Sequence, residues 1–394
     1  MRYRIETDSL GEIKIPAEAY YGINTARSAN NFAITKRSIN RQMIKSLTIV
    51  KKAAAKANMD ALEISPEVAE AIIASCDEIL NGRLHGQFIT DLIQGGAGYS
   101  MNMNANEVIA NRANEMLGGS KGTYEFVHQL DHVNLNQTIN DVIPTASKIA
   151  LTKQIKKLQV ELKKLKDTFS SKAKELLNAE LDELGQMFNA SSSALARDLK
   201  RLDQAIASLS ELNMGAQILG ENNIVNQKYA KKIVYYINKY SGEEFEKAKD
   251  LVDATRNFDA YVYTSSVLKI LATNLSKIAT DFMSCMAYSL YGVDKLNIPL
   301  IQENPKKHFM NFETLDVVKQ ISFFVEGLDL TITKIDYTNT TFRNILKYQL
   351  VLPNVNVYFD LFYLVIVIIT FTFKIQTILK KLTSNMFYYT IWSN

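Results

Sequence analysis

Apolar residues recur at alternating intervals of three and four along three long stretches of the chain. Such spacing lays the apolar side chains along one face of an α-helix. Three stripes of this kind, separated by short breaks, predict an antiparallel bundle of long helices. The stripes comprise Ile155, Leu158, Leu162, Leu165 and Phe169, then Leu195, Leu199, Leu202, Ile206 and Leu209, and finally Leu268, Leu271, Leu275, Ile278 and Phe282.

The region before the bundle has a less regular pattern. It contains short helices, of which one is predicted over Ser65–Leu80 because Ser65 and Pro66 supply an N-cap and a first-turn proline. A glycine-rich loop, Gln94–Gly98, leads into the polar run Ser100–Asn106. We therefore expect a smaller, mixed helical N-terminal domain ahead of the bundle.

The end of the chain changes character. The run LFYLVIVIITFTF at Leu361–Phe373 carries no charge and is rich in β-branched and aromatic residues. It is short for a membrane span, and extending it back to Val355 takes in Asp360, so a buried segment is the better interpretation. The pattern predicts three domains, with residues 1–140 as the N-terminal domain, 141–335 as the bundle and 336–394 as a divergent apolar segment.

Composition narrows the classes of protein. A net charge of +4 over 394 residues gives no reason to expect nucleic acid as a partner. The two cysteines, Cys76 and Cys285, predict reduced, buried thiols in a cytosolic protein. No cluster of His, Cys or acidic residues has metal-ligand spacing, so no metal is expected. The start of the chain lacks the apolar core of a secretory signal, and the cytoplasm is the expected location.

Four stretches of the chain have sequences that occur in the same order in one known family. They read RIETDSLGEIKIPAEAYYGINTARSANNF (Arg4–Phe32), QGGAGYSMNMNANEVIANRAN (Gln94–Asn114), HQLDHVNLNQTINDVIPTA (His128–Ala146) and DLVDATRNFDAYVYTSSVLKILATNLSKIATD (Asp250–Asp281). The chain thereby resembles the aspartate ammonia-lyases of the aspartase/fumarase superfamily. The resemblance covers roughly residues 1–302, weakens to about residue 333 and then stops.

This resemblance implies a fold and a reaction. The fold is all-α, with an aspartase/fumarase-type long central helical bundle and a smaller mixed helical N-terminal domain. The family forms homotetramers, and each active site draws on three chains. The reaction is the reversible elimination of ammonia from L-aspartate to give fumarate, without an organic cofactor. A base removes a proton, and positioned hydrogen-bond donors stabilise the doubly charged intermediate.

The resemblance also assigns candidate site residues. Ser100 matches the serine of the family's Thr-Ser pair, while the larger Tyr99 replaces the threonine. Asn140 matches the asparagine that contacts substrate, and its neighbour Ile139 stands where a hydroxyl residue is usual. Thr138 replaces a serine and keeps a hydroxyl that can donate. We predict Ser100, Thr138 and Asn140 as substrate contacts.

Two polar groups near these residues have simpler explanations. Asn102, Asn104, Asn106 and Asn111 form a polar set that in the family lies near the site, but hydrogen bonding between helices explains them equally well. His128 and His132 precede the third stretch's substrate segment, and we expect them to hold that loop in place.

Two motifs of the family are missing. Leu184–Gln186 directly follows LLNAELDE, so the segment with the Thr-His/Gln pair is deleted near 178–184. The signature loop with the serine base should follow LNIPLIQ at Leu296–Gln302. In its place stands ENPKKHFMNFET, Glu303–Thr314, which has no serine. His308 in this replacement loop is the only candidate catalytic base that we identify.

Three interpretations remain open from the sequence. The chain is a working lyase with a base rebuilt around His308, or a pseudoenzyme subunit that assembles with itself or with an intact paralogue. Alternatively, its reading frame slipped after the Leu328–Thr333 stretch. The combined loss of base and donors favours inactivity of the isolated chain. The expected partners are L-aspartate or fumarate if it is active, and a homotetramer or hetero-oligomer, with neither nucleic acid nor membrane.

Overall fold

The computed structural model describes residues 2–338 apart from residues 95, 179–181, 217–224 and 288–312. Most of the described residues are helical, and only short strands accompany them. The chain divides into two compact units. Of the described residues, the first unit contains 2–152, 209–259 and 334–338, and the second contains 153–208 and 260–333. The predicted three-domain division stays a prediction.

A two-stranded antiparallel sheet opens the first unit. Strand β1 (Tyr3–Asp8) pairs with β2 (Gly11–Pro16), and Tyr3 lies opposite Pro16. Gly11 has a φ of 109°, a conformation that side chains disfavour, and it follows the turn directly. The helical patterns do not predict this hairpin. The alternation of Ile13 and Ile15 with polar residues is the signal that indicates it.

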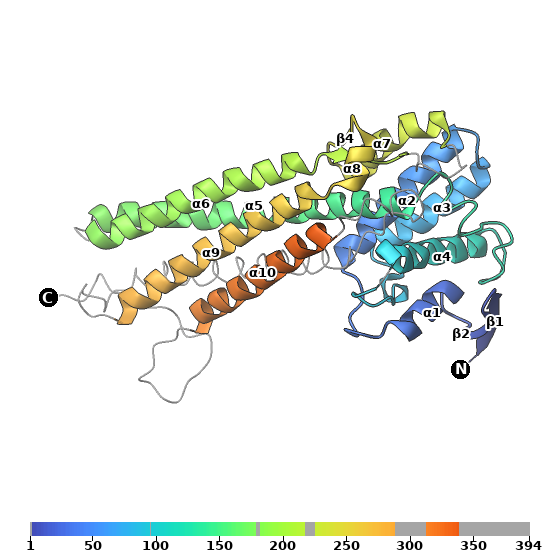
Figure 1. The fold of residues 1–394 in the computed structure, drawn as a ribbon, viewed down its shortest axis with the longest axis horizontal. Coiled ribbons are helices and arrows are strands. Elements are labelled where there is room, and N and C mark those ends of the chain that lie inside the picture. The colour runs from blue at the N-terminus through green and yellow to red at the C-terminus, as the bar shows by residue number, and fades with distance from the viewer. Residues whose placement is uncertain (1, 95, 179–181, 217–224, 288–312, 339–394) are drawn as a thin grey trace. The chain divides into compact units, whose positions relative to one another are not determined.

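Five helices and two short turns follow in the N-terminal part of this unit. Helix α2 packs against α3, and α3 packs against α4, while α1 lies on α4 (Figure 1). Ser65 caps α3 through a 3.3 Å bond from the Val68 N–H, and Pro66 is the first helical residue, as predicted. The elements are α1 (Ile23–Asn31), α2 (Arg41–Asp60), α3 (Pro66–Leu80), the 3₁₀ turns η1 (His85–Gln87) and η2 (Gly96–Gly98), α4 (Tyr99–Met116) and the start of α5 (Ile139–Asn178).

The rest of the first unit lies later in the sequence. Strand β3 (Glu211–Leu212) pairs in parallel with β4 (Glu246–Lys247). Helix α7 (Gln227–Ser241) packs along α2, and the short α8 (Leu251–Arg256) contacts β3. Residues 209–259 therefore belong to the first unit although they follow residues 153–208 of the second unit in the sequence.

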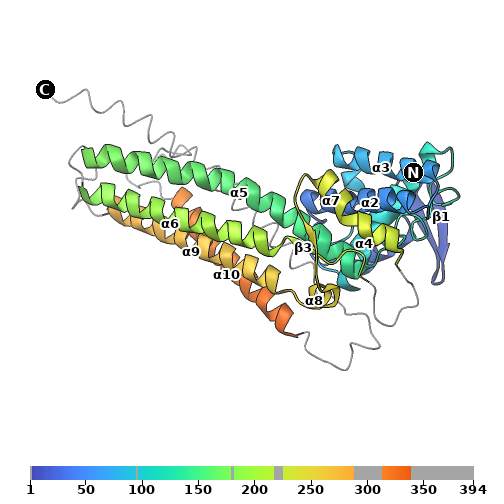
Figure 2. The ribbon, with the colours of Figure 1, turned by 90° about the horizontal axis from the view of Figure 1, so that it is seen from above.

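The second unit is a bundle of long helices. The later part of α5 runs beside α6 (Asp182–Ser208), α9 (Asp259–Ala287) and α10 (Glu313–Thr338) in both ribbon views (Figures 1 and 2). Phe169, Phe188 and Phe282 meet in its core, with ring centroids 4.9 to 5.8 Å apart. The prediction of an all-α protein with a long helical bundle is confirmed.

Two of the three predicted apolar stripes are buried along their whole length, and the third is buried in part. Every stripe residue of α5 and α9 is buried. On α6 the prediction is partly wrong, because Leu199 and Ile206 are only half-buried and Leu209 lies beyond the helix end. Asp198, directly before Leu199, is buried instead, and its carboxylate accepts hydrogen bonds from the side-chain amide of Asn274 on α9.

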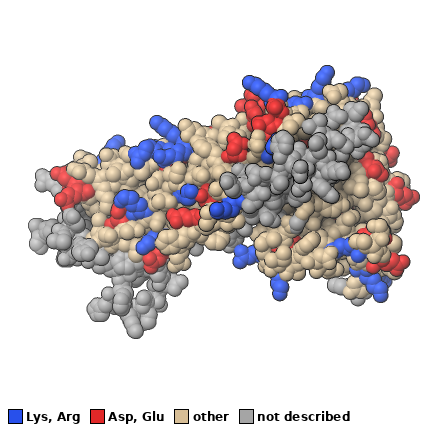
Figure 3. Space-filling model, in the orientation of Figure 1, with Lys and Arg blue, Asp and Glu red and all other residues tan. Residues whose placement is uncertain are grey.

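Several further expectations can be compared with the described residues. Cys76 is buried, but Cys285 is only half-buried because it lies close to the end of α9, so that expectation is wrong for Cys285. Within the described ranges, no helix has the length and apolarity to cross a membrane, and no three His, Cys, Asp or Glu side chains form a metal-binding group. Acidic and basic side chains are interspersed on the face shown in Figure 3. The apolar run Leu361–Phe373 lies outside the described residues.

Candidate substrate-binding site

The glycine-rich loop brings the start of α4 against α5. Gly96 and Gly98 have φ values of 67° and 84°, which glycine adopts at little cost. A Cβ at Gly98 would lie 3.2 Å from Cγ1 of Ile143, so the absence of a side chain allows this close approach. Ser100 follows at the second position of α4 and is buried, whereas Tyr99 keeps 45 % of its surface exposed.

A capping arrangement begins α5. The N–H and hydroxyl of Thr138 donate to Oδ1 of Asp141 over 2.8 and 3.3 Å. Thr138 and Asp141 stand three residues apart, as in a capping box, and this motif was readable in the sequence although it was not predicted. The hydroxyl of Thr138 therefore points to Asp141, and its role as a substrate contact stays a prediction.

Asn140 occupies the first turn of α5 with 5 % of its surface exposed. Its side-chain oxygen, Oδ1, has no hydrogen-bond partner among the described residues. Buried polar atoms are almost always paired, so this acceptor can take a hydrogen bond from a ligand or a water. It is one of several such atoms on the first turns of α4 and α5, where the side-chain oxygens of Asn102, Asn106, Thr145 and Ser147 also have no partner among the described residues. The role of Asn140 as a substrate contact stays a prediction.

Segment 211–215 runs along the first turns of α5. The ammonium of Lys148 donates to the carbonyl of Glu211 over 2.6 Å, and Asn213 donates to the carbonyl of Asn140 over 2.8 Å. The N–H of Gly215 lies 3.3 Å from Oδ2 of Asp141. The segment thus contacts α5 at three residues, and no local pattern in the sequence predicts these contacts.

Two buried charges hold the chain that leads into α5. Lys51 on α2 is fully buried and donates to Oδ1 of Asn134 over 2.7 Å and to Oε1 of Gln137 over 3.0 Å. Burial lowers the pKa of Lys51 to about 7, against the attraction of Asp141. Burial also raises the pKa of Asp141 to about 6, although three hydrogen bonds and Lys51 oppose the rise. Both ends of segment 134–141 are therefore fixed by buried ionisable groups.

The asparagines of α4 fasten loops to this helix. Asn102 and Asn106 donate to Oδ1 of Asn134 over 3.1 and 3.2 Å. Asn104 bonds the backbone of Gln87 and Ile89, and Asn111 bonds that of Tyr20 and Gly122. All four side chains therefore make hydrogen bonds between elements, but Oδ1 of Asn102 and of Asn106 has no partner among the described residues.

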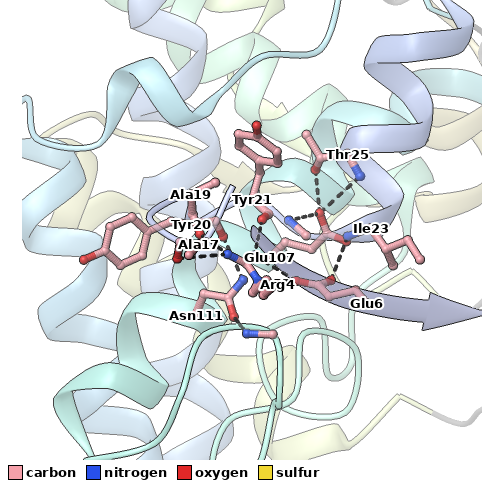
Figure 4. A network of polar contacts seen from close by, with 12 residues as sticks. Arg4, Glu6, Ala17, Ala19, Tyr20, Tyr21, Ile23, Thr25, Glu107 and Asn111 are labelled. Carbon is pink, nitrogen blue, oxygen red and sulfur yellow. Dashed lines mark hydrogen bonds and ion pairs between the residues drawn. The ribbon is translucent and has the colours of Figure 1, made fainter. Parts of the chain in front are cut away.

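A second network ties the N-terminal stretch to α4 (Figure 4). The carboxylate of Glu107 accepts hydrogen bonds of 2.8 to 3.2 Å from the N–H groups of Gly22, Asn24 and Thr25, and one of 2.6 Å from the Thr25 hydroxyl. It caps the N-terminus of α1, where Gly22 offers no side chain of its own. Burial raises the pKa of Glu107, and these donors oppose the rise.

Comparison with known proteins decides the family. The sequence profile of the family described as Lyase matches residues 11–303. The aspartate ammonia-lyase of Bacillus subtilis (strain 168) is 43 % identical over 345 residues, which cover 84 % of this chain and 72 % of that protein. The enzyme of the same name from Escherichia coli (strain K12) is 37 % identical over 348 residues, with the same two coverages. The chain belongs to the aspartase/fumarase superfamily of lyases.

Solved structures agree with this family. A fumarate lyase/delta-crystallin protein of Brucella melitensis has a TM-score of 0.87 and 32 % identity, covering 96 % of this chain and 84 % of that one. The class II fumarase of Schistosoma mansoni, at 24 % identity and a TM-score of 0.83, shares the fold.

The histidines of this lyase-family chain have different positions. Nδ1 of His132 accepts the backbone N–H of His128 over 2.9 Å, and Nδ1 of His128 accepts that of Asp131 over 3.2 Å. These bonds hold the loop before α5, which is the role expected of both residues. His308, the candidate base, lies outside the described residues, so its role stays a prediction.

Proposed function

We propose that this lyase-family chain binds L-aspartate where α4 and α5 begin, and that the isolated chain does not convert it to fumarate. The observation that carries the binding proposal is the buried, unpartnered Oδ1 of Asn140. An acceptor of this kind suits a ligand that presents N–H groups, because an unpaired buried oxygen costs about 1–3 kcal/mol. The names of the relatives at 37 to 43 % identity support aspartate as that ligand.

The proposed contacts differ in their chemistry. Oδ1 of Asn140 accepts a hydrogen bond from the ammonium group of L-aspartate. The hydroxyl of Ser100, at the N-terminus of α4, donates to a carboxylate, and the positive end of the helix dipole favours the same charge. Thr138 supports the site through Asp141.

A comparison of two ligands tests the binding proposal. Succinate has the skeleton of L-aspartate without the ammonium group, so titration calorimetry with both ligands isolates that group. We expect L-aspartate to bind at least about tenfold more tightly than succinate, since tenfold corresponds to one good hydrogen bond of ~1.4 kcal/mol. Asn140→Ala should abolish the preference. Equal affinities in the unaltered chain would contradict the proposal.

The proposed inactivity rests on the absence of two family motifs from the sequence. Segment Glu303–Thr314 lacks a serine, and the deletion near 178–184 removes further donors. When several catalytic groups act together, removing one of them abolishes most of the rate acceleration. An ultraviolet assay for fumarate, with L-aspartate and magnesium, should therefore give no signal from the folded chain. Turnover that disappears in His308→Ala would show instead that the replacement loop supplies a base.

We also propose that the chain is a pseudoenzyme subunit of a cytoplasmic homotetramer, or of a hetero-oligomer with an intact paralogue. Helix α10 supports assembly because it leaves large apolar side chains exposed, in two pairs spaced by seven residues. The pairs are Val317 with Phe324 and Phe323 with Leu330, and they are 42 to 62 % exposed. Light scattering should give a tetramer mass, and Phe323→Ser with Leu330→Ser should lower it. A monomer in the unaltered chain would contradict assembly with itself.

A further inference from the structure

The carbonyl oxygen of Asn140 occupies a special place in α5. In a regular helix the N–H of the residue four positions later donates to each carbonyl. For Asn140 that residue is Pro144, which has no N–H. The sequence therefore withholds the usual donor from the residue whose side chain is proposed to face the ligand.

A side chain distant in sequence takes the place of this donor. Nδ2 of Asn213 donates to the carbonyl oxygen of Asn140 over 2.8 Å, and to Oγ1 of Thr255 over 2.9 Å. Both hydrogens of the amide are thus in use, and 1 % of the Asn213 surface is exposed. Asn213 directly follows β3, which β4 holds by parallel pairing. The donor therefore lies directly beside a paired strand of two residues.

We propose that Asn213 is a positioning residue that orients Asn140 by holding its carbonyl group. This inference rests on the proposed binding of L-aspartate by Asn140. The side chain of Asn140 leaves the backbone at Cα, the atom next to this carbonyl. Because Pro144 supplies no N–H, the bond from Asn213 holds the first turn of α5 in place, and with it the Cα from which the side-chain amide of Asn140 projects.

A neighbouring contact supports the same arrangement. The N–H of Gly215, two residues after Asn213, lies 3.3 Å from Oδ2 of Asp141. Segment 213–215 thus holds the carbonyl of Asn140 and the side chain of the next residue together. A regular helix bond from residue 144 would have left no need for Asn213 at this point.

The experiment measures L-aspartate affinity and thermal stability in the full chain. Asn213→Ala removes the donor. The control is Asn238→Ala, because the amide of Asn238 likewise donates to a backbone carbonyl, that of Phe245, over 2.9 Å, and Asn238 is not among the proposed ligand contacts. We expect Asn213→Ala to weaken L-aspartate binding about tenfold or more, and Asn238→Ala to lower the melting temperature without changing the affinity.

A double-mutant cycle separates positioning from general stability. In the Asn140→Ala background, Asn213→Ala should cause no further loss of affinity, while its effect on the melting temperature should remain. Pro144→Ala restores an N–H that can reach the Asn140 carbonyl, so it should recover part of the affinity lost in Asn213→Ala. If Asn213→Ala does not fold, Asn213→Gln, which displaces the amide by one methylene, is expected to weaken binding in the same way.

The outcomes distinguish the two proposals. If the unaltered chain does not bind L-aspartate, the proposed function fails and this inference fails with it. If the unaltered chain binds L-aspartate and Asn213→Ala binds it equally well, the positioning role alone is overturned. An undiminished effect of Asn213→Ala in the Asn140→Ala background would likewise overturn it.

Discussion

The ammonium group of Lys51 lies 2.7 Å from Oδ1 of Asn134, and 0 % of the Lys51 surface is exposed. The same oxygen accepts hydrogen bonds from the amides of Asn102 and Asn106. The ammonium group of Lys51 thus donates to neutral amides and not to a carboxylate. Among the described residues, Lys51 forms no ion pair. Burying an ammonium group on these terms favours its neutral form, which explains the lowered pKa of about 7.

This burial makes stability depend on pH. Lys51 has a pKa of 10.5 when solvated and of about 7 in the fold, so the unfolded chain binds more protons between these values. The contribution of Lys51 to the free energy of unfolding is therefore at its full value above pH 10.5. It falls by up to ~1.4 kcal/mol per pH unit as the pH drops to 7. Lys51→Met should lack this dependence. Urea unfolding at pH 7, 8 and 9 measures it.

The control for this prediction is Lys163→Met, because Lys163 is exposed on α5. The difference in unfolding free energy between Lys163→Met and the unaltered chain should stay constant with pH. A constant difference for Lys51→Met as well would show that the ammonium group is solvated in the folded chain.

Asp141 should give the opposite sign at lower pH. Burial raises its pKa from 3.8 to about 6, so the folded chain binds more protons between these values. The stability from this group is complete below pH 3.8 and is lost as the pH rises through 6. Asp141→Asn keeps an oxygen for Thr138 but does not titrate, so relative to the unaltered chain it should gain up to about 3 kcal/mol between pH 4 and pH 6.5. Unfolding curves at pH 4, 5 and 6.5 that show no relative change would contradict the prediction.

Gly98, directly before α4, and Gly118, two residues after its last residue, provide a matched pair of glycines. Both have a left-handed backbone, with φ values of 84° and 86°. A Cβ at Gly98 meets Ile143, whereas a Cβ at Gly118 has nothing within 4 Å. Gly118→Ala should cost about 1–2 kcal/mol of unfolding free energy through backbone strain alone, and Gly98→Ala should cost more. Ile143→Val should reduce the excess cost of Gly98→Ala, and equal costs for the two glycines would contradict the steric explanation.

The sequence predicted those features that depend on residues close together in the chain. The stripes of α5 and α9 and the Ser65 cap of α3 follow from local spacing, and each is present. The hairpin β1–β2 and the box formed by Thr138 and Asp141 carried local signals that were not used.

Other features depend on contacts that no local pattern contains. Lys51 and Lys52 are adjacent and chemically alike, yet Lys51 is buried among amides while Lys52 pairs with Asp77 on α3. Asn213 reaches Asn140 across 73 residues of sequence. The absence of an N–H at Pro144 could be read from the sequence, but the identity of the replacement donor required the structure.

The last prediction concerns Asp198 and Asn274, which join α6 to α9 inside the bundle. The amide of Asn274 lies 2.9 and 3.0 Å from the two carboxylate oxygens of Asp198, and Arg201 donates to one of them over 2.6 Å. Burial raises the pKa of Asp198, and these donors oppose the rise. Asp198→Leu leaves the half-buried amide of Asn274 and the guanidinium of Arg201 without this acceptor, so it should lose about 1–3 kcal/mol of unfolding free energy.

Replacing both partners should be less costly than replacing one. Leu195 and Leu202 flank Asp198 on α6, and Leu271 and Leu275 flank Asn274 on α9, and all four are buried. Asp198→Leu with Asn274→Leu places two apolar side chains where their neighbours are already apolar, and such replacements of buried polar pairs are often neutral or stabilising. Urea unfolding should therefore give the double variant a higher free energy of unfolding than Asp198→Leu alone. If the two single losses simply add in the double variant, Asp198 and Asn274 contribute independently, and the prediction is contradicted. A loss in the double variant that is smaller than in Asp198→Leu alone would show that the single loss comes from leaving the Asn274 amide without its acceptor.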